Sequence, residues 1–271
     1  MENIIGHILR FTGRDLSVYA DSFLQKIINK RIVESSVKNV SDYLMFLNDN
    51  PVEEEILLNS LNISYSLFFR NLLDFSIVER FIFPSLLQRN VNKQSSSIRI
   101  WSAGCADGSE AYSLAIIGNE LMTNRLNGNP PLIFATDLSE KALVKARTGA
   151  YYGASLQNVT LNQLETWFTK TNQVYRVGEN LKKCIEFSHY DLLDTKTGSP
   201  PSAIFGGFDL VTCCNVLVYY KREIQELILE KLYRSLGHKG FLMVDSSEKA
   251  IVKSFKGFRL YSALGNIFVK I

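Results

Sequence analysis

The sequence is short of cysteine and histidine, which limits the kinds of site that it can form. Only four cysteines occur in 271 residues, and no two of them form a C-x-x-C pair. A chain of this size with so few thiols is typical of a reduced, cytoplasmic protein rather than of a disulfide scaffold. The three histidines lie far apart in the chain, so we expect no metal site.

Net charge and long apolar runs are also scarce. Lys and Arg number 30 against 27 Asp and Glu, a net charge of +3, which is too small to predict nucleic acid as a partner. No apolar run approaches the roughly 18 residues that a membrane span needs, and residues 1–10 lack the order of a signal peptide. With 46% apolar and 21% charged residues, the composition excludes disorder. It predicts a soluble, cytoplasmic protein with no direct membrane insertion.

The first third of the chain has helical spacing throughout. Apolar residues recur three and four positions apart in an amphipathic stripe, at Phe23, Leu24, Ile27, Ile28 and Ile32. Pro51, after Asn50 and before three glutamates, predicts a helix start. A helix over residues 72–88 should be kinked or divided by Pro84. Before a polar linker at 89–97, the sequence predicts a small all-helical domain over residues 1–89.

From residue 98 onwards, short apolar strands alternate with helices, which predicts βαβ units and a parallel sheet. The expected strands are 98–102, 132–136, 184–188, 208–213 and 240–245. Residues 255–261 and 265–271 lie four residues apart and should pair as an antiparallel hairpin at the sheet edge. Residues 151–183 fit no βα unit and are interpreted as an inserted small subdomain. The fold class is therefore α/β, over residues 98–271.

The turn after the first strand predicts a ligand site, because open α/β sheets bind ligands at the carboxyl ends of their strands. Gly104 and Gly108 allow a tight turn and a close approach of the backbone to a ligand. Their spacing is neither the G-x-G-x-x-G of dinucleotide binding nor a phosphate loop. Asp137 ends the second strand, where its carboxylate can accept hydrogen bonds from both ribose hydroxyls of a nucleoside. The alternative is a helix-capping role, since a helix begins near Ser139.

Two further polar residues follow later strands. Asp191 can accept the exocyclic amine of adenine or be a solvated loop acid, and Asn215 can hold a charged end of a ligand or cap its turn. Together with the glycine turn and Asp137, they describe a nucleoside without phosphates, which S-adenosylmethionine fits better than NAD or ATP. The terminal hairpin on a parallel sheet is similar to the Rossmann-like sheet of class I methyltransferases.

Longer motifs extend these observations. Phe68-Phe69-Arg70-Asn71 resembles an FFR signature, and residues 100–105 with 108–115 resemble the stretch WSAGCSTGEEPYSLA. Further matches are Ala135-Thr136-Asp137, Phe208-Asp209-Leu210, Asn215 to Tyr220 and Asp245-Ser246-Ser247-Glu248. In these motifs and their order, the sequence resembles the chemotaxis receptor methyltransferases, the CheR family, nearly from end to end.

The resemblance implies an S-adenosylmethionine-dependent methyltransferase that esterifies glutamate side chains of chemoreceptors and releases S-adenosylhomocysteine. It implies Arg70 and Tyr219 as catalytic residues. The residues implied for cofactor binding are Ser64, Ser66, Arg70, Gly104, Glu110, Asp137, Asp191, Leu192, Asn215 and Val216. The sequence departs from the family pattern at Ser64-Tyr65-Ser66, at Ser109 and at Cys214, where the family has a guanidinium that cysteine does not replace. These departures bear on the substrate more than on the cofactor.

A basic stripe in the helical domain predicts where a receptor docks. Lys26 and Lys30 lie one turn apart with Arg31 beside them, and a glutamate-rich receptor helix would be attracted to them. The alternative is an ordinary solvated helix face. The expected partner is therefore the cytoplasmic domain of chemoreceptors. Two other functions stay open: a sensor that binds S-adenosylmethionine or S-adenosylhomocysteine, and a methyltransferase of the same fold that acts on a protein outside chemotaxis.

Overall fold

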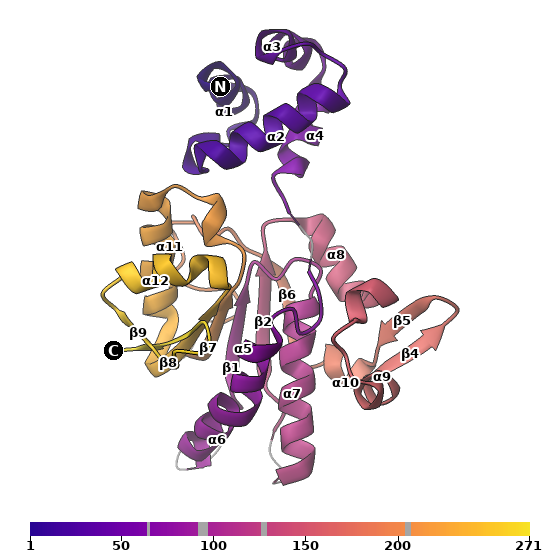
Figure 1. The fold of residues 1–271 in the computed structure, drawn as a ribbon, viewed down its shortest axis with the longest axis vertical. Coiled ribbons are helices and arrows are strands. Elements are labelled where there is room, and N and C mark those ends of the chain that lie inside the picture. Colours follow the sequence, from indigo (N-terminus) through magenta and orange to yellow (C-terminus); the bar gives the residue numbers. More distant parts are fainter. Residues whose placement is uncertain (64–65, 92–96, 126–128, 204–206) are drawn as a thin grey trace. The chain divides into compact units, whose positions relative to one another are not determined.

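A computed structural model describes residues 1–63, 66–91, 97–125, 129–203 and 207–271 (Figure 1). The chain forms two compact units: residues 1–63 with 216–226, and residues 64–215 with 227–271. Each unit has a hydrophobic core of its own. Within the described ranges, no helix is both long and apolar enough to cross a membrane.

The first unit is helical, as predicted. It contains α1 (Glu2–Thr12), a 3-10 turn (Leu16–Val18), α2 (Asp21–Glu34), α3 (Val40–Asp49) and α4 (Pro51–Ser60). Pro51 opens α4, so the predicted helix start is confirmed. The apolar stripe of α2 is buried in the core of this unit, at Phe23, Leu24, Ile27 and Ile28.

A distant segment of the chain, residues 216–226, completes the helical unit. Tyr19 and Tyr220 form an antiparallel bridge, and their rings stack with centroids 5.1 Å apart. The backbone N–H of Ala20 donates to the carbonyl of Tyr219 at 2.8 Å, and that of Lys221 donates to the carbonyl of Val18 at 3.0 Å. The loop after β7 (Phe208–Cys213) is therefore held by residues from the start of the chain.

The helical unit ends earlier than predicted, at residue 63 instead of 89. Helices α5 (Leu72–Ile77) and α6 (Phe83–Val91), separated by a π-helical turn at Val78–Ile82, belong to the second unit. Their apolar side chains lie in the same buried cluster as residues of β1 (Arg99–Ala103) and α7 (Ser109–Arg125). Helical spacing predicts a helix but does not say which core it packs into.

The sequence predicted that Pro84 kinks or divides its helix. The α-helical pattern is interrupted by the π-helical turn that ends two residues before Pro84. Residues 89–97 were expected to be a linker. Helix α6 continues to Val91, and residues 92–96 lie outside the described part.

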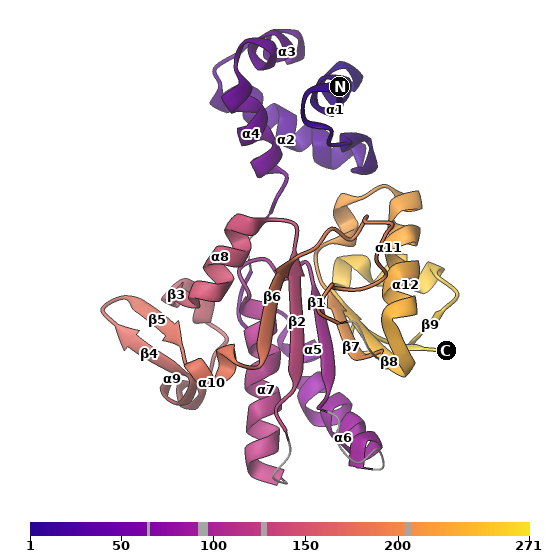
Figure 2. The same cartoon turned by 180° about the vertical axis from the view of Figure 1, so that it is seen from behind.

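A seven-stranded sheet in the order β6-β2-β1-β7-β8-β10-β9 forms the centre of the second unit (Figures 1 and 2). Its other strands are β2 (Leu132–Asp137), β6 (Ile185–His189), β8 (Leu236–Val244), β9 (Phe258–Leu260) and β10 (Ile267–Lys270). The first five strands in this order pair in parallel, and β10 pairs antiparallel with both β8 and β9. The predicted α/β sheet with its terminal antiparallel hairpin is confirmed.

Further helices connect or flank the strands. They are α8 (Glu140–Thr148), α11 (Arg222–Ser235), whose first turn belongs to the helical unit, and α12 (Lys249–Ser254). Helix α7 lies in front of the strands in Figure 1 and behind them in Figure 2, so it covers one face of the sheet. The predicted caps of α8 are present, because the Ser139 hydroxyl accepts from the N–H of Ala142 and Gly149 closes the helix in a left-handed conformation.

A second, smaller sheet accounts for residues 151–183, for which no detail was predicted. Strands β3 (Ala150–Tyr152), β5 (Val174–Val177) and β4 (Phe168–Thr171) pair antiparallel in that order. Helices α9 (Leu161–Trp167) and α10 (Glu179–Lys182) complete this subdomain. Its buried residues join the main core of the second unit, so it is not a separate folding unit.

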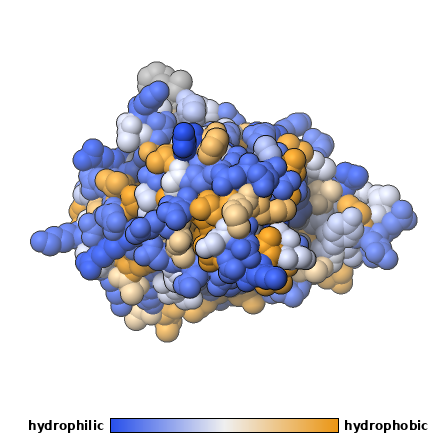
Figure 3. All heavy atoms as spheres, turned by 90° about the horizontal axis from the view of Figure 1, so that it is seen from above, coloured by the Kyte–Doolittle hydropathy of each residue, from blue (hydrophilic) through white to orange (hydrophobic). Residues whose placement is uncertain are grey.

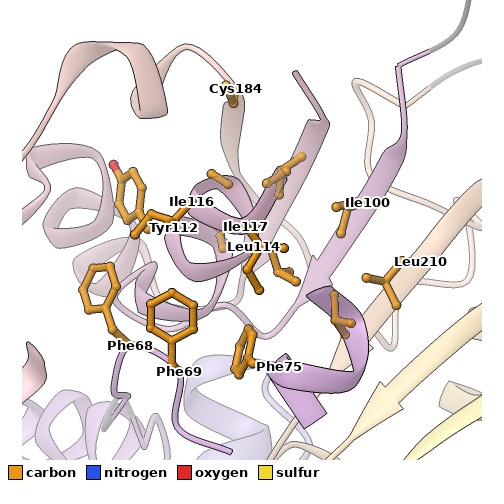
Figure 4. Close-up of a cluster of buried hydrophobic side chains, with 14 of the residues drawn as sticks. Phe68, Phe69, Phe75, Ile100, Tyr112, Leu114, Ile116, Ile117, Cys184 and Leu210 are labelled. Atoms are coloured by element: carbon orange, nitrogen blue, oxygen red, sulfur yellow. The ribbon is translucent and has the colours of Figure 1, made fainter. Parts of the chain in front are cut away.

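Aromatic side chains from the segment before α5 pack against α7 in this core. Figure 4 shows Phe68, Phe69 and Phe75 beside Tyr112, Leu114 and Ile116. The ring of Phe68 meets that of Tyr151 edge to face, with centroids 4.8 Å apart. The core thereby joins the FFR motif, helix α7 and the small sheet.

Candidate functional site

The central strands bring three predicted site residues to one edge of the sheet. β1 pairs with β2 on one side and with β7 on the other, in parallel. Gly104 follows β1, Asp137 ends β2 and Asn215 follows β7. The carboxyl ends of adjacent parallel strands meet at a switch in strand order, which is where open α/β sheets bind ligands.

The glycine turn after β1 is tied to the end of β2. Gly104 has φ of 76° and Gly108 has φ of 85°, values that glycine adopts without strain. The N–H groups of Gly104 and Cys105 both donate to the carbonyl of Thr136, at 2.8 and 2.9 Å. A Cβ at Gly108 would lie 2.9 Å from the Cβ of Ala146, so the turn packs closely on α8. The prediction that both glycines shape a tight turn is confirmed.

Asp137 holds the glycine turn and the start of α8 together. Its Oδ2 accepts from the N–H of Ala106 at 2.8 Å, and its Oδ1 accepts from the N–H of Ser139 at 2.8 Å. The capping of α8 falls to Ser139 itself. Burial raises the pKa of Asp137, against the lowering effect of these two N–H donors and of His189. Its assignment to the ribose hydroxyls stays a prediction.

Glu110, in the first turn of α7, is anchored to two strands. Its Oε1 accepts from the hydroxyl of Ser102 on β1 at 2.7 Å and also from the hydroxyl of Thr212 on β7. Sequence reasoning did not identify these hydroxyls, although both lie near the ends of predicted strands. The carboxylate is thus fixed beside the glycine turn, and its assignment to the cofactor's amino group stays a prediction.

A support network behind the glycine turn was also missed. The Asp107 carboxylate accepts from the Ser109 hydroxyl at 2.7 Å and from Lys145 Nζ at 2.9 Å, and its carbonyl accepts from the Tyr151 hydroxyl. Asp107 is 2% exposed. An aspartate two residues before a helix-starting serine is a signal for such a cap. The partners on α8 and β3 could not be found without the fold.

The later strands supply the remaining contacts of the edge. The N–H of Tyr190 donates to the carbonyl of Asp137 at 3.1 Å. This bond holds the chain after β6, where Asp191 and the buried Leu192 lie, next to the end of β2. The Asp191 carboxylate accepts from the N–H of Leu193 at 2.8 Å, an Asx turn. Asp191 and Leu192 therefore stay candidate adenine contacts.

Asn215 adopts φ of 60°, and its N–H donates to Glu248 Oε2 at 2.9 Å. Glu248 is fully buried and also accepts from the N–H of Asp245, so it links the ends of β7 and β8. This role was not predicted for Glu248, although the sequence placed it in a family motif. The backbone of Asn215 is therefore fixed, and its contact with the ligand stays a prediction.

The other predicted residues are placed less directly. Arg70 is exposed and Ser66 is half-buried in the second unit, whereas Ser64 lies outside the described residues. Val216 and Tyr219 belong to the segment held by the helical unit, where the Tyr219 ring lies 4.8 Å from that of Phe23. Their roles stay predictions.

The structure corrects the interpretation of Arg31 as a docking residue. Arg31 is 9% exposed, and its Nη2 and Nε donate to the two oxygens of Glu53 at 2.6 and 2.8 Å. Tyr43 donates to the same carboxylate at 2.7 Å. The guanidinium faces the core of the helical unit because it neutralises a buried acid there.

Lys26 and Lys30 are exposed, as the docking hypothesis requires. The face in Figure 3 is mainly hydrophilic, with hydrophobic residues scattered among the hydrophilic ones. Docking of a receptor at these lysines stays a prediction.

The carboxyl ends of the central strands form a site that fits a nucleoside without phosphates. Glu110 and Asp137 place two carboxylates at the glycine turn, and Asp191 follows strand β6, which pairs with β2. Phosphate groups would be repelled there, whereas ribose hydroxyls, an adenine amine and an ammonium group would find acceptors. Among the described residues, no group of three Cys, His, Asp or Glu side chains is placed to hold a metal ion.

Relatives of known family share most of the chain. The chemotaxis protein methyltransferase of Listeria monocytogenes is 28% identical over 261 residues, 96% of this chain and 93% of the relative. That of Salmonella typhimurium is 28% identical over 242 residues, 85% of this chain and 78% of the relative. Of solved structures, TrmN from Thermus thermophilus overlaps with a TM-score of 0.39 at 16% identity, covering 69% of this chain and 49% of that one.

The model of one family, described as the CheR methyltransferase, SAM binding domain, matches residues 64–263. This range holds every strand of the main sheet except β10, together with the glycine turn and all three carboxylates. The chain therefore belongs to the CheR methyltransferase family, and its cofactor is S-adenosylmethionine.

Proposed function

We propose that the chain is a protein-glutamate O-methyltransferase of the cytoplasm. It transfers the methyl group of S-adenosylmethionine to glutamate carboxylates in the cytoplasmic domain of chemoreceptors. The products are a glutamate methyl ester and S-adenosylhomocysteine. The name that the curated relatives carry, chemotaxis protein methyltransferase, supports this class of substrate.

One observation carries the proposal: an exposed arginine adjoins a cofactor edge that is otherwise acidic. The N–H of Phe69, one residue before Arg70, donates to the hydroxyl of Ser113 on α7 at 2.9 Å. The carboxylates of Glu110 and Asp137 would repel a free carboxylate substrate. Arg70 supplies the positive charge that an anionic acceptor needs, through a planar fork that matches a carboxylate.

The chemistry needs no general base. A glutamate side chain has a reference pKa of about 4.3 and is ionised near neutral pH. Its oxygen is hydrated and weakly nucleophilic, so the protein must remove water and hold that oxygen roughly 3 Å from the methyl carbon, opposite the sulfur. In this proposal Arg70 binds a carboxylate, of the substrate or of the cofactor, and the Tyr219 hydroxyl orients the acceptor.

The test is the chemical stability of the transferred label. The protein is incubated with S-adenosylmethionine labelled in its methyl group and, in separate reactions, with membranes and with soluble proteins of the native cell, and the labelled products are treated with alkali. Methyl esters release methanol in alkali and N-methyl groups do not. We expect volatile label from membrane proteins.

Three other outcomes contradict the proposal in different ways. Alkali-labile label on soluble proteins alone points to a substrate outside chemotaxis, and alkali-stable label to another acceptor atom. Cofactor binding without transfer points to a sensor.

The role of Arg70 gives a second test. We expect Arg70→Ala to abolish transfer and to leave thermal unfolding unchanged, because the side chain is exposed. Arg80→Ala, which removes another exposed arginine of the same unit, is the matched control and should keep its activity. Wild-type turnover in Arg70→Ala would remove this residue from the mechanism.

A further inference from the structure

The backbone of Phe69 is held in a conformation that bulky residues rarely adopt. Its φ is 50°, in the left-handed region. For a bulky residue this is an outlier that is strained and persists only where surrounding contacts impose it. Such strain is found most often at functional sites, and Arg70 is the next residue.

The left-handed turn explains how two adjacent aromatic residues are buried while the third residue is exposed. Consecutive side chains of an extended chain point in opposite directions. Here Phe68 is fully buried and Phe69 is 6% exposed, in the same core cluster. Figure 4 shows their rings side by side next to α7. Arg70, after the turn, is exposed.

Two side chains from other elements hold both polar groups of the strained residue. The N–H of Phe69 donates to Ser113 Oγ at 2.9 Å, and the Ser113 hydroxyl donates to the carbonyl of Ser109 at 2.7 Å. The carbonyl of Phe69 accepts from Asn158 Nδ2 at 3.1 Å. The N–H of Phe68 also donates to the carbonyl of Ser155, at 3.1 Å.

We propose that Ser113 and Asn158 are positioning residues that aim Arg70 by clamping Phe69 in its left-handed conformation. This proposal rests on the role of Arg70 in the proposed function. Ser113 is fully buried on the helix that carries Glu110, so it ties the backbone before Arg70 to the cofactor edge. Asn158 precedes α9, so the small-sheet subdomain supports the same turn.

Asn158 gives the cleaner test, because it is only partly buried, whereas Ser113 lies in the core. Without the donor, the Phe69 carbonyl loses its partner and the turn can relax. We expect Asn158→Ala to lower the rate of methyl transfer about tenfold, the effect of one lost hydrogen bond of roughly 1.4 kcal/mol. Asn158→Asp, equal in shape but lacking the amide donor, should lower it at least as much. The matched control is Asn162→Ala, an exposed asparagine of the same subdomain.

Two readouts separate positioning from a general loss of structure. The melting temperature of Asn158→Ala should differ from that of the Asn162→Ala control by only a few degrees, as for one partly buried hydrogen bond in a large domain. Whichever parameter Arg70→Ala changes, the turnover number or the dissociation constant of S-adenosylhomocysteine, Asn158→Ala should change in the same direction. In the Arg70→Lys background, which keeps the positive charge without the planar fork and should keep measurable transfer, the second substitution should cost clearly less than tenfold.

The outcomes are distinct. Equal rates for Asn158→Ala and Asn162→Ala, or a full tenfold further loss in the Arg70→Lys background, would overturn the positioning role while leaving the proposed function intact. Full activity of Arg70→Ala would overturn the roles of Arg70 and of both positioning residues, whereas the alkali test decides the proposed function separately.

Discussion

The two carboxylates proposed to bind the cofactor are already hydrogen-bonded to other parts of the protein. Asp137 binds two N–H groups of the protein and Glu110 binds two hydroxyls, so each carboxylate is oriented before any cofactor arrives. Oriented acceptors lose little conformational freedom on binding, which favours affinity. The same contacts imply that substitutions here change the turn as well as the contact with the ligand.

Asp137→Ala should weaken cofactor binding by about 1–3 kcal/mol, the loss of charged hydrogen bonds. Isothermal calorimetry with S-adenosylhomocysteine measures this directly. Asp209→Ala removes an acidic side chain at the opposite end of the sheet, where its Oδ2 accepts from the N–H of Arg99, and serves as control. An unchanged dissociation constant in Asp137→Ala would leave Asp137 with a purely structural role.

The pH dependence of binding should also report on Asp137. Burial raises the pKa of Asp137 above that of an ordinary aspartate. On acidification, its carboxylate therefore takes up a proton at a higher pH than an ordinary aspartate does. A protonated carboxyl accepts hydroxyl donors poorly, and we expect affinity to be full at neutral pH and to fall as the pH drops through this raised pKa. Folding stability changes in the opposite direction. Because the pKa of Asp137 is raised in the folded state, the contribution of this group to stability is present at low pH and is lost as the pH rises through the raised pKa. Calorimetry at several pH values should show a weaker dependence in Asp137→Asn.

The sequence predicted the positions of single residues correctly where a turn or a strand end determines them. Gly104 and Gly108 were located in the turn after a predicted strand and Asp137 at the end of one, because these positions follow from the local sequence. Arg31 was misread as an exposed docking residue because its partner Glu53 lies on another helix, 22 residues away. Charge spacing along one helix does not reveal a buried acid on its neighbour.

Among the elements, the turn between β1 and α7 is the most constrained. It joins a central strand to the helix that carries Glu110 and packs closely on α8. A side chain at Gly108 meets both a left-handed φ and a contact of 2.9 Å with Ala146. Both effects disfavour any residue with a Cβ.

Gly108→Ala should therefore lower the free energy of unfolding by about 1–2 kcal/mol from the backbone alone, with steric strain added. Urea unfolding at neutral pH measures the change. Gly198→Ala is the control, because nothing lies within 4 Å of a Cβ there. Equal stability of the two variants would mean that α8 moves away without cost.

Elements were predicted more reliably than the units they belong to. The parallel strands and the hairpin were recognised from short apolar runs and from the short spacing between the last two strands. Helices α5 and α6 were assigned to the wrong unit, because their spacing is the same whichever core buries them. The small sheet was not predicted in detail, since its strands are three or four residues long.

For the molecule as a whole, the exposed lysines of α2 are where a charged partner would act. Replacing Lys26 and Lys30 by glutamate should reduce receptor methylation, and more so at low salt, because the screening length falls from about 30 Å at 0.01 M salt to about 8 Å at 0.15 M. Methylation rates over a salt series check this. Lys253→Glu with Lys256→Glu makes the same change of charge at exposed positions of the other unit. An equal loss at all salt concentrations, or in the control, would count against docking at α2.

The helical unit is discontinuous in sequence, and this affects what a truncation experiment can measure. A protein that starts at residue 64 keeps Tyr219, Tyr220 and Lys221 but loses the backbone of residues 18–20 to which they are bonded. Deleting the amino-terminal helices would thus remove the proposed docking lysines and release the loop that carries Tyr219 in a single step. An inactive fragment would be uninformative about recognition, and point substitutions on the outside of α2 are the way to separate the two effects.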